Sequence, residues 1–536
     1  MKSTESLSRM FISLSCLLFL FCGISRAADA ENPIIWADVP DISIIRVGDD
    51  YYMSSTTMHL SPGLPIMKSK NLVDWDIVSY AYDVLVDTDG LSLRNGKSEY
   101  GAGSWASSMR YHNGTFYVST FAMSSGKTHI YSTKDIVNEP WKEIAFSPML
   151  HDHSLFFDDD GKVYMLHGAT DLRLTELNAD LSGVKEGGFN DIVIKNVGHV
   201  SSPEKNWGEG SQLFKIHGKY YLCNITWPDM RTQLVHRADK ITGPYEGRVL
   251  LHDQGVAQGG LIDTPDGRWY AYLFQDCGAV GRVPFLVPLK WEDGWPVVEG
   301  DGKASKTLDI KRKRQGLGNI VTSDEFDRPA EILAELKSAK KNNKYVRAAF
   351  PMAWQWNHNP VNDLWSLTDR PGWLRLTTGR IDKTLIEARN SLTQRTFGPA
   401  CSATTLIDLS GIKDGDYAGL AALQRKYGFV GVKMEGGKKS IVMVNTDDEG
   451  VVAGEKAIPL DSNTVHLKIE CNFKDRTDRA LFFWSPDGKE WNQIGDSLHM
   501  IYTLPHFMGY RFALFHFSTE KTGGHVDFDF YRINDL

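Results

Sequence analysis

Three acidic residues that are far apart in the sequence occupy the same position in a repeated pattern. Asp41, Asp152 and Glu209 each lie 11 or 12 residues before a tyrosine, and a serine follows each acid two positions later. Carboxyl groups that converge repel each other, so their pKa values separate and they can divide acid and base roles. An inverting glycosidase needs such a pair, one to protonate the leaving group and one to activate water. A third carboxylate near the acid would raise its pKa. The alternatives are acids that cap strand starts or bind a stabilising cation.

The tyrosines belong to a repeat in which an apolar strand, a turn containing glycine and an aromatic pair lead into a second strand. Asn-Gly, Asp-Gly and His-Gly turns between β-branched and aromatic runs are typical of β-hairpins. The spacing of roughly 45 to 65 residues fits a propeller blade of about four strands. We therefore predict an all-β, five-bladed β-propeller; a β-sandwich whose hairpins are similar by chance is the alternative. The repeated tyrosines are Tyr52, Tyr117, Tyr164, Tyr221 and Tyr270.

A propeller brings equivalent positions of its blades together around a central channel, because it is radially symmetric. The three acids should therefore meet at one mouth of this channel. Trp105 and Gln258 occupy the same offset in the other two blades. Trp105 and Trp207 stand near the predicted mouth, where they either stack on sugar faces or simply pack. His153, beside Asp152, is either a sugar contact or part of the wall.

Composition changes after the repeats end. Residues 28–310 are assigned to the propeller, and the basic segment 311–323 is interpreted as a solvated linker. Residues 324–536 contain short alternating strands and form a separate C-terminal β-sandwich (jelly-roll-like) domain, with one short helix over 331–344. We expect the sandwich to pack on the propeller and help to wall the pocket, through Trp354, Trp356 and His358. The alternative is that these side chains are core residues of the sandwich.

The N-terminus predicts export. Lys2 and Arg9 precede an apolar run over residues 10–24, and small residues follow, so residues 1–27 are predicted to be a secretory signal peptide. The mature protein should be periplasmic or secreted, without membrane insertion. Its scattered cysteines, without metal-ligand spacing, are interpreted as buried free thiols. A net charge of −8 gives no footprint for nucleic acid.

Longer motifs carry a resemblance to a known family. The segments that begin at Asn32 (NPIIWADVPDISIIRVGDDYYMSST), Asp152 (DHSLFFDDDGKVYMLHG), Glu209 (EGSQLFKIHGKYYL) and Gln258 (QGGLIDTPDGRWYAYLF) resemble glycoside hydrolase family 43. The C-terminal region is similar to the β-sandwich appended to many members. The resemblance implies that Asp41 is the general base and Glu209 the general acid. It also implies that Asp152 modulates the pKa of the acid and orients it.

The resemblance also bears on ligands. Arg282 matches a family position that contacts substrate; a salt bridge within the blade is the alternative. Many members have a histidine on blade five that contacts a central calcium, whereas this chain has Gln258, which we count among the substrate-binding candidates. No cofactor is expected to be required, and a structural calcium in the channel is left open.

The implied activity is an exo-acting, inverting release of terminal α-L-arabinofuranosyl residues from plant polysaccharide fragments such as hemicellulose. A β-D-xylosidase of the same mechanism is the alternative within the family. A non-catalytic carbohydrate-binding propeller is the alternative from another class; it would keep the aromatic residues and lose at least one carboxylate. Oligosaccharide or polysaccharide is the expected partner, and the sequence says nothing about protein partners.

Overall fold

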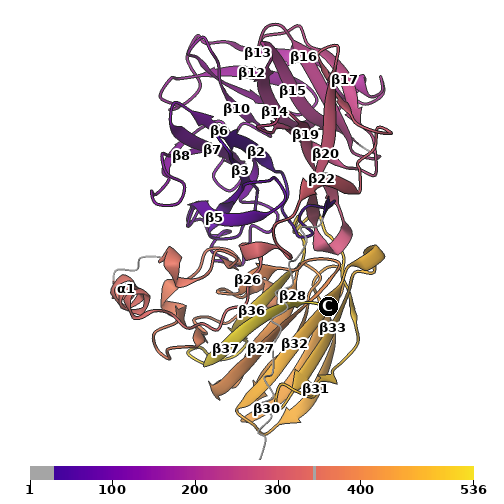
Figure 1. Ribbon diagram of the computed structural model, residues 1–536. Helices are drawn as coiled ribbons and strands as arrows, with labels where there is room; N and C mark the ends of the chain where they lie inside the picture. Colours follow the sequence, from indigo (N-terminus) through magenta and orange to yellow (C-terminus); the bar gives the residue numbers. More distant parts are fainter. Residues whose placement is uncertain (1–28, 228, 342–345) are drawn as a thin grey trace, which may run out of the picture.

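The computed structural model describes residues 29–227, 229–341 and 346–536, which form two bodies in contact (Figure 1). The body shown in indigo to magenta is built from the first half of the chain, and the body in orange to yellow from the second half. The predicted signal peptide lies outside the described residues. None of the described helices is long and apolar enough to cross a membrane.

The first body is a five-bladed β-propeller, as the repeat predicted. Each blade is a four-stranded antiparallel sheet whose strands follow chain order, and the predicted hairpins form its first two strands. The blades are β2 (Ser43–Val47), β3 (Asp50–Ser54), β4 (Gly63–Ser69), β5 (Trp75–Tyr82); β6 (Ser104–His112), β7 (Thr115–Ala122), β8 (Lys127–Thr133), β9 (Lys142–Phe146); β10 (Ser154–Phe157), β11 (Val163–His167), β12 (Leu172–Leu177), β13 (Asn190–Ile194); β14 (Glu209–Ile216), β15 (Lys219–Thr226), β16 (Thr232–Ala238), β17 (Glu246–Leu251); and β18 (Ala257–Asp263), β19 (Trp269–Asp276), β20 (Arg282–Glu292), β21 (Trp295–Val298).

Serine hydroxyls join neighbouring blades around the channel and explain part of the repeated motif. Ser43 Oγ accepts the N–H of Met109 at 3.0 Å, and Ser154 Oγ accepts the N–H of Leu213 at 2.9 Å. Each bond satisfies a buried backbone donor of the next blade, which would otherwise be costly. Ser211 does not follow this rule, because a bulge between Glu209 and Gln212 shifts the register; its Oγ has no partner among the described residues.

The basic segment that follows blade five is not a solvated linker. Arg312 donates to the carbonyl oxygens of Val73 and Ile34 at 3.0 and 2.7 Å, and Arg314 pairs with Asp76 at 2.6 Å. These partners belong to blade one or to the strand entry before it. The positive charges therefore fasten the segment to the propeller. Just before this segment, β22 (Thr307–Lys311) pairs with β1 (Asp29–Glu31), which anchors the N-terminal end of the described chain.

The second body is a β-sandwich, as predicted. One sheet has the order β23-β26-β36-β28-β29-β30-β31 and the other β24-β25-β37-β27-β32-β33-β34, with β35 paired to β33. The predicted helix is α1 (Ala330–Lys341), and residues 342–344 of that prediction lie outside the described residues. The strands are β23 (Gln355–Trp356), β24 (Trp365–Ser366), β25 (Leu374–Thr377), β26 (Leu392–Arg395), β27 (Ala400–Gly411), β28 (Asp416–Leu423), β29 (Gly428–Glu435), β30 (Lys438–Thr446), β31 (Val452–Leu460), β32 (Thr464–Asn472), β33 (Arg479–Ser485), β34 (Asn492–Gln493), β35 (Leu498–His499), β36 (Arg511–Ser518) and β37 (His525–Asp535).

Short 3₁₀ turns complete both bodies. Two lie in the propeller, one between the third and fourth blades and one before β20. Another follows β22, and the remaining four belong to the sandwich. They are η1 (Val197–Val200), η2 (Gly278–Val280), η3 (Gly318–Ile320), η4 (Arg347–Ala349), η5 (Asn362–Leu364), η6 (Leu385–Glu387) and η7 (Lys474–Arg476).

The two bodies share one continuous hydrophobic core. Trp75 and Tyr80 of blade one belong to the same buried cluster as Trp356 and Phe350 of the sandwich. The backbones also pair, since Ser61 and Trp356 exchange two hydrogen bonds of 3.1 and 2.6 Å. A shared apolar core means that separation would expose buried surface on both bodies.

Candidate active site

The acids are held at the channel mouth by an unusual backbone conformation. Asp41, Asp152 and Gln258 have left-handed φ angles of 51°, 44° and 64°, and Gly210 has a φ of 70°. Residues other than glycine rarely adopt this region, and such residues cluster at functional sites. A Cβ atom on Gly210 would lie 2.8 Å from Gln258 Cγ, so a larger residue there would displace the Gln258 side chain. Glu209 therefore stands one residue before the position that Asp41 and Asp152 occupy in their blades.

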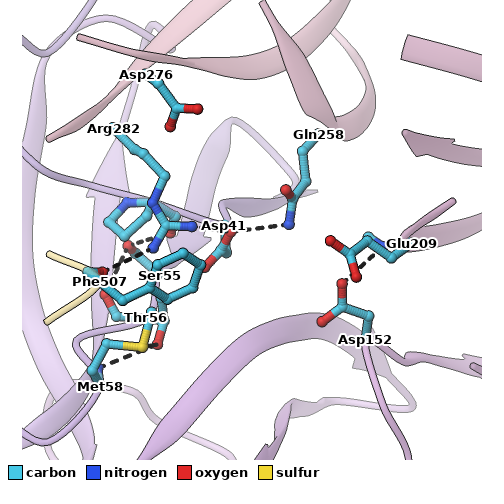
Figure 2. A network of polar contacts seen from close by, with 12 residues as sticks. Asp41, Ser55, Thr56, Met58, Asp152, Glu209, Gln258, Asp276, Arg282 and Phe507 are labelled. Carbon is cyan, nitrogen blue, oxygen red and sulfur yellow. Dashed lines mark hydrogen bonds and ion pairs between the residues drawn. The ribbon is translucent and has the colours of Figure 1, made fainter. Parts of the chain in front are cut away.

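Asp41 is buried between two donors from blade five. Arg282 Nη1 and Gln258 Nε2 each donate to Oδ1 of Asp41 at 2.9 Å (Figure 2). Among the hydrogen bonds of the described residues, none reaches the other oxygen, Oδ2. Burial raises the pKa of Asp41, while the charges of Arg282 and Arg231 oppose this rise. The arrangement fixes one oxygen and leaves the second free to accept a proton from water.

Asp152 and Glu209 lie together on the other side of the mouth, away from Arg282 (Figure 2). Oδ2 of Asp152 accepts the N–H of Gly210 at 2.9 Å, which ties the loop before blade three to the first strand of blade four. Burial raises the pKa of Asp152 to about 7, and the charge of Glu209 adds to this rise while His151 opposes it. The Glu209 side chain is 22% exposed, so it can reach a bound molecule.

The sequence reasoning missed two residues that contact Glu209. His151 Nε2 lies 3.2 Å from Oε2 of Glu209, and Trp227 Nε1 donates to Oε1 at 3.3 Å. The position of His151 directly before Asp152 was an available signal. Trp227 directly follows β15, the second strand of blade four, and so lies just beyond the hairpin that repeats in each blade. The ring of Trp207, which was predicted as a substrate contact, packs edge-on against Trp227 at 5.5 Å. Both tryptophans are exposed, at 40% and 38%.

The other predicted contacts are distributed unevenly. Trp105 is half-buried on β6, and its ring approaches those of His151 and Phe507 at 6.4 and 6.0 Å. His153 is 2% exposed, and its two ring nitrogens bond Leu150 O and Ser119 Oγ at 2.9 and 2.8 Å. Its position therefore favours the wall and not a sugar contact.

Arg282 is 2% exposed and donates to Asp41, so its position favours an ion pair with Asp41 over a free contact with substrate.

The sandwich reaches this site through a residue that was not predicted. Phe507 has a left-handed φ of 57°, and its ring stacks on the Arg282 guanidinium at 4.6 Å. Trp354 and Trp356 lie instead in the shared core. His358 is buried at the interface, where its ring meets that of His59 at 4.5 Å. The sandwich thus completes the apolar wall beside Asp41.

The channel below the acids does not fit a calcium ion. A cavity of about 10 Å³ lies among Asp41, Asp152 and Gln258, which is room for about one water molecule. Calcium takes six to eight oxygen ligands, whereas Arg282 and Gln258 here direct N–H donors at the carboxylate. Deeper in the channel, Arg110 Nη2 donates to Ser154 Oγ at 2.6 Å and to Leu213 O at 3.2 Å. A guanidinium cation thus already pairs with two oxygens of blades three and four inside the propeller.

His151, Asp152 and Glu209 offer three potential ligand atoms that lie within 4.8 Å of one another. His151 contacts Glu209, and Asp152 accepts the N–H of Gly210, so these atoms already have partners within the protein. With Asp41 opposite, the site has one carboxylate held by a cation and one accessible carboxyl group, Glu209, beside a carboxyl of raised pKa. This division of roles suits the addition of water to a bond whose leaving group needs a proton.

Comparisons with known proteins give the same assignment for both bodies. The family described as "Glycosyl hydrolases family 43" matches residues 30–296. A second family, described as "Beta xylosidase C-terminal Concanavalin A-like domain", matches residues 343–534. The two matches cover the propeller and the sandwich respectively.

Similar proteins carry both pentosidase names. A putative β-xylosidase of Xylanibacter ruminicola is 31% identical over 86% of this chain and 82% of its own length. A non-reducing end α-L-arabinofuranosidase of Bacteroides ovatus is 27% identical over 73% of each chain. The solved structure titled "Bifunctional GH43-CE" from Bacteroides eggerthii is 53% identical with a TM-score of 0.89. It covers 95% of this chain, which spans 64% of that longer protein.

Proposed function

Because the chain belongs to glycosyl hydrolase family 43 and is a glycoside hydrolase, we propose that it removes single terminal pentosyl residues from plant polysaccharide fragments with inversion. The observation that carries this proposal is the placement of Asp41 on one side of the mouth and Glu209 with Asp152 on the other (Figure 2). Inverting hydrolysis uses two carboxyl groups about 6.5–9.5 Å apart, with a water molecule beside one and the leaving group beside the other.

Asp41 is proposed as the general base. Arg282 and Gln258 hold Oδ1, so the lone pairs of Oδ2 can take a proton from the attacking water. The raised pKa of Asp41 makes its carboxylate a stronger base once it is ionised. The water oxygen attacks the anomeric carbon from the face opposite the leaving group, which inverts the configuration.

Glu209 is proposed as the general acid. Its carboxyl proton passes to the glycosidic oxygen as the bond between that oxygen and the anomeric carbon breaks. Asp152 supports this role in two ways, since it fixes the backbone of Gly210 and, where it is ionised, adds negative potential near Glu209. Negative potential favours the protonated form of a neighbouring carboxyl.

The sugar is proposed to be β-D-xylosyl or α-L-arabinofuranosyl. The sequence favoured arabinofuranosyl, and relatives bear both names. Phe507, Trp105 and the Trp207–Trp227 pair supply apolar surfaces near the acids, which suits a pocket for a chain end. Hemicellulose fragments are the proposed natural substrates. We also propose that the protein is exported, as residues 1–27 predict.

The test is hydrolysis of nitrophenyl β-D-xylopyranoside and α-L-arabinofuranoside, with D41N as the control. The preferred sugar is the one with the higher kcat/KM. Proton NMR of the first product should show the inverted anomer. A non-catalytic carbohydrate-binding propeller would bind xylo- or arabino-oligosaccharides but release nitrophenol from neither substrate. This outcome would reject the proposal. A retained anomer would reject the mechanism.

A further inference from the structure

His151 lies between the two carboxyl groups on the acid side of the site. Its Nε2 atom is 3.2 Å from Glu209 Oε2 and 3.9 Å from Asp152 Oδ2, and its side chain is 32% exposed. The carbonyl oxygen of His151 accepts the N–H of Gly168 at 2.9 Å, which fixes the backbone. The imidazole is therefore held against the acid while one part of it still faces solvent.

The remaining surroundings of His151 do not compete for its proton. Its ring packs against Phe121 at 5.1 Å and Trp105 at 6.4 Å, which carry no charge. Its titratable neighbours, besides Asp152 and Glu209, are His153 and His167.

Burial lowers the pKa of both neighbouring histidines to about 4, so they are neutral near pH 6. Burial also opposes protonation of His151, but the hydrogen bond to Glu209 and the charges of both carboxylates outweigh it and raise its pKa.

We propose that His151 stores the proton that Glu209 delivers, and returns it to Glu209 after each turnover. This inference rests on the proposed role of Glu209 as general acid. His151 is a positioning residue, because it acts through Glu209 and not on the sugar. The proton is bound either to Oε2 of Glu209, with Nε2 of His151 as the acceptor, or to Nε2 of His151, with Oε2 of Glu209 as the acceptor.

The proton balance of a cycle is closed by solvent. Glu209 gives its proton to the glycosidic oxygen as the bond to the anomeric carbon breaks. Water adds to that carbon, and its proton passes to Asp41. Glu209 is then a carboxylate; the exposed imidazole takes a proton from solvent, and Nε2–H passes it to Oε2. Asp41 releases its proton to solvent, and both carboxyl groups are restored.

A shared proton changes the pH dependence of the reaction. A carboxyl–imidazole pair loses its last proton at a higher pH than the carboxyl alone, because the proton has two places to sit. The proton shared with His151 therefore extends the activity toward alkaline pH. Replacing His151 with a residue that cannot titrate should move the alkaline limb of kcat/KM to lower pH, by about one unit for a tenfold difference in proton affinity.

The kinetic test compares H151Q, which keeps a hydrogen-bonding group near Glu209, with H151F, which removes it. The substrates are an unactivated pentosyl disaccharide and an aryl pentoside with a good leaving group. On the disaccharide, H151Q should keep most of the rate at acid pH while its alkaline limb moves down. H151F should lose rate as well. On the aryl pentoside, the limb of both variants should match that of wild type. If the alkaline limb of kcat/KM for H151Q on the disaccharide lies at the same pH as in the wild type, the proposal is overturned.

A second measurement does not depend on activity. Histidine ¹⁵N NMR titration of the whole protein, with H151Q to assign the signal, should give a pKa for His151 above its ordinary value of about 6.5. E209Q should return it toward that value. An ordinary pKa of His151 in both the wild type and E209Q would overturn the proposed role of His151, even if the enzyme hydrolyses pentosides. A raised pKa that falls in E209Q, with no hydrolysis, would reject the proposed function and leave the pairing intact.

Discussion

Arg282 Nη1 donates to Oδ1 of Asp41 at 2.9 Å, and the two side chains are only 2% and 5% exposed. Arg282 begins β20 in blade five, whereas Asp41 precedes β2 in blade one. The ion pair therefore joins the last blade to the first, where the ring of blades closes. The same contact orients Asp41, so the closure of the ring and the orientation of the proposed base share one buried pair.

R282M should weaken both stability and catalysis. Removing one partner of a buried pair leaves the other charge uncompensated, which costs about 3–5 kcal/mol. Asp41 then loses the cation that lowers its pKa, so its pKa rises further and the acid limb of kcat/KM moves to higher pH. Denaturant unfolding and pH–rate profiles measure the two effects.

R46M is the matched control for R282M. Arg46 also pairs a blade-one residue with blade five, through Asp263, but these side chains are 28% and 32% exposed. A more exposed pair contributes roughly 0–1 kcal/mol. R46M should therefore leave the pH profile unchanged. Equal losses in the two variants would contradict the assignment of Arg282 to Asp41.

E209Q should lower turnover on an unactivated disaccharide by at least about 100-fold, because the leaving group loses its proton donor. An aryl pentoside with a good leaving group needs little protonation, so its loss should be much smaller. The ratio of the two losses, from steady-state kinetics, is the measured quantity. Equal losses on both substrates would count against Glu209 as the acid.

D152N should change stability in a pH-dependent way. The pKa of Asp152 is about 7 in the folded protein against 3.8 ordinarily, so the folded state binds more protons between these values. The stabilisation is complete below pH 3.8 and is lost as pH rises through 7. The Tm of D152N, relative to that of the wild type, should therefore increase as the pH rises from 4 to 8. D309N, at a side chain that is 98% exposed, is the control and should show no trend.

The same variant tests the proposed link between Asp152 and the acid. Without the negative charge of Asp152, the acid should lose its proton at lower pH, so the alkaline limb of kcat/KM should move down and the rate should fall. An unchanged limb would mean that Asp152 only positions Gly210 and substrate.

Chelation should leave the protein unaffected. Because Arg110 and Arg282 supply the positive charge in and beside the channel, excess EDTA or added calcium should change neither the Tm nor kcat/KM. Differential scanning fluorimetry and rate assays measure this. A fall in Tm with EDTA that calcium reverses would show that the channel holds a metal after all.

F507A should raise KM more than it lowers kcat, because it opens the wall beside Asp41 without removing a reacting group. L504A is the control in the same loop, since Leu504 is 73% exposed. Steady-state kinetics on the preferred nitrophenyl pentoside separate the two constants. Unchanged KM in F507A would mean that the sandwich contributes stability only.

The sequence alone predicted the architecture and the convergence of the three acidic residues at one mouth of the channel, for one physical reason. Hairpins have a local signature in turn residues and aromatic pairs, and radial symmetry converts a shared offset within a blade into a shared position in space. Asp41, Asp152 and Gln258 could thus be placed together although more than 200 residues separate the first from the last. Glu209 followed the same offset to within one residue. The sandwich was predicted from alternation in its strands.

Tertiary structure decided which side chains meet, because contacts between distant elements leave no period in the sequence. The pairing of Arg282 with Asp41 depends on ring closure, and that of Trp227 with Glu209 on the return of β15 to the channel mouth. The bulge at Glu209 moved Ser211 out of the ring of bonded serines. Phe507 reaches the site only because a shared hydrophobic core docks the sandwich against blades one and five. Local pattern fixes which blade a residue belongs to, whereas its partners depend on how the blades and the sandwich pack.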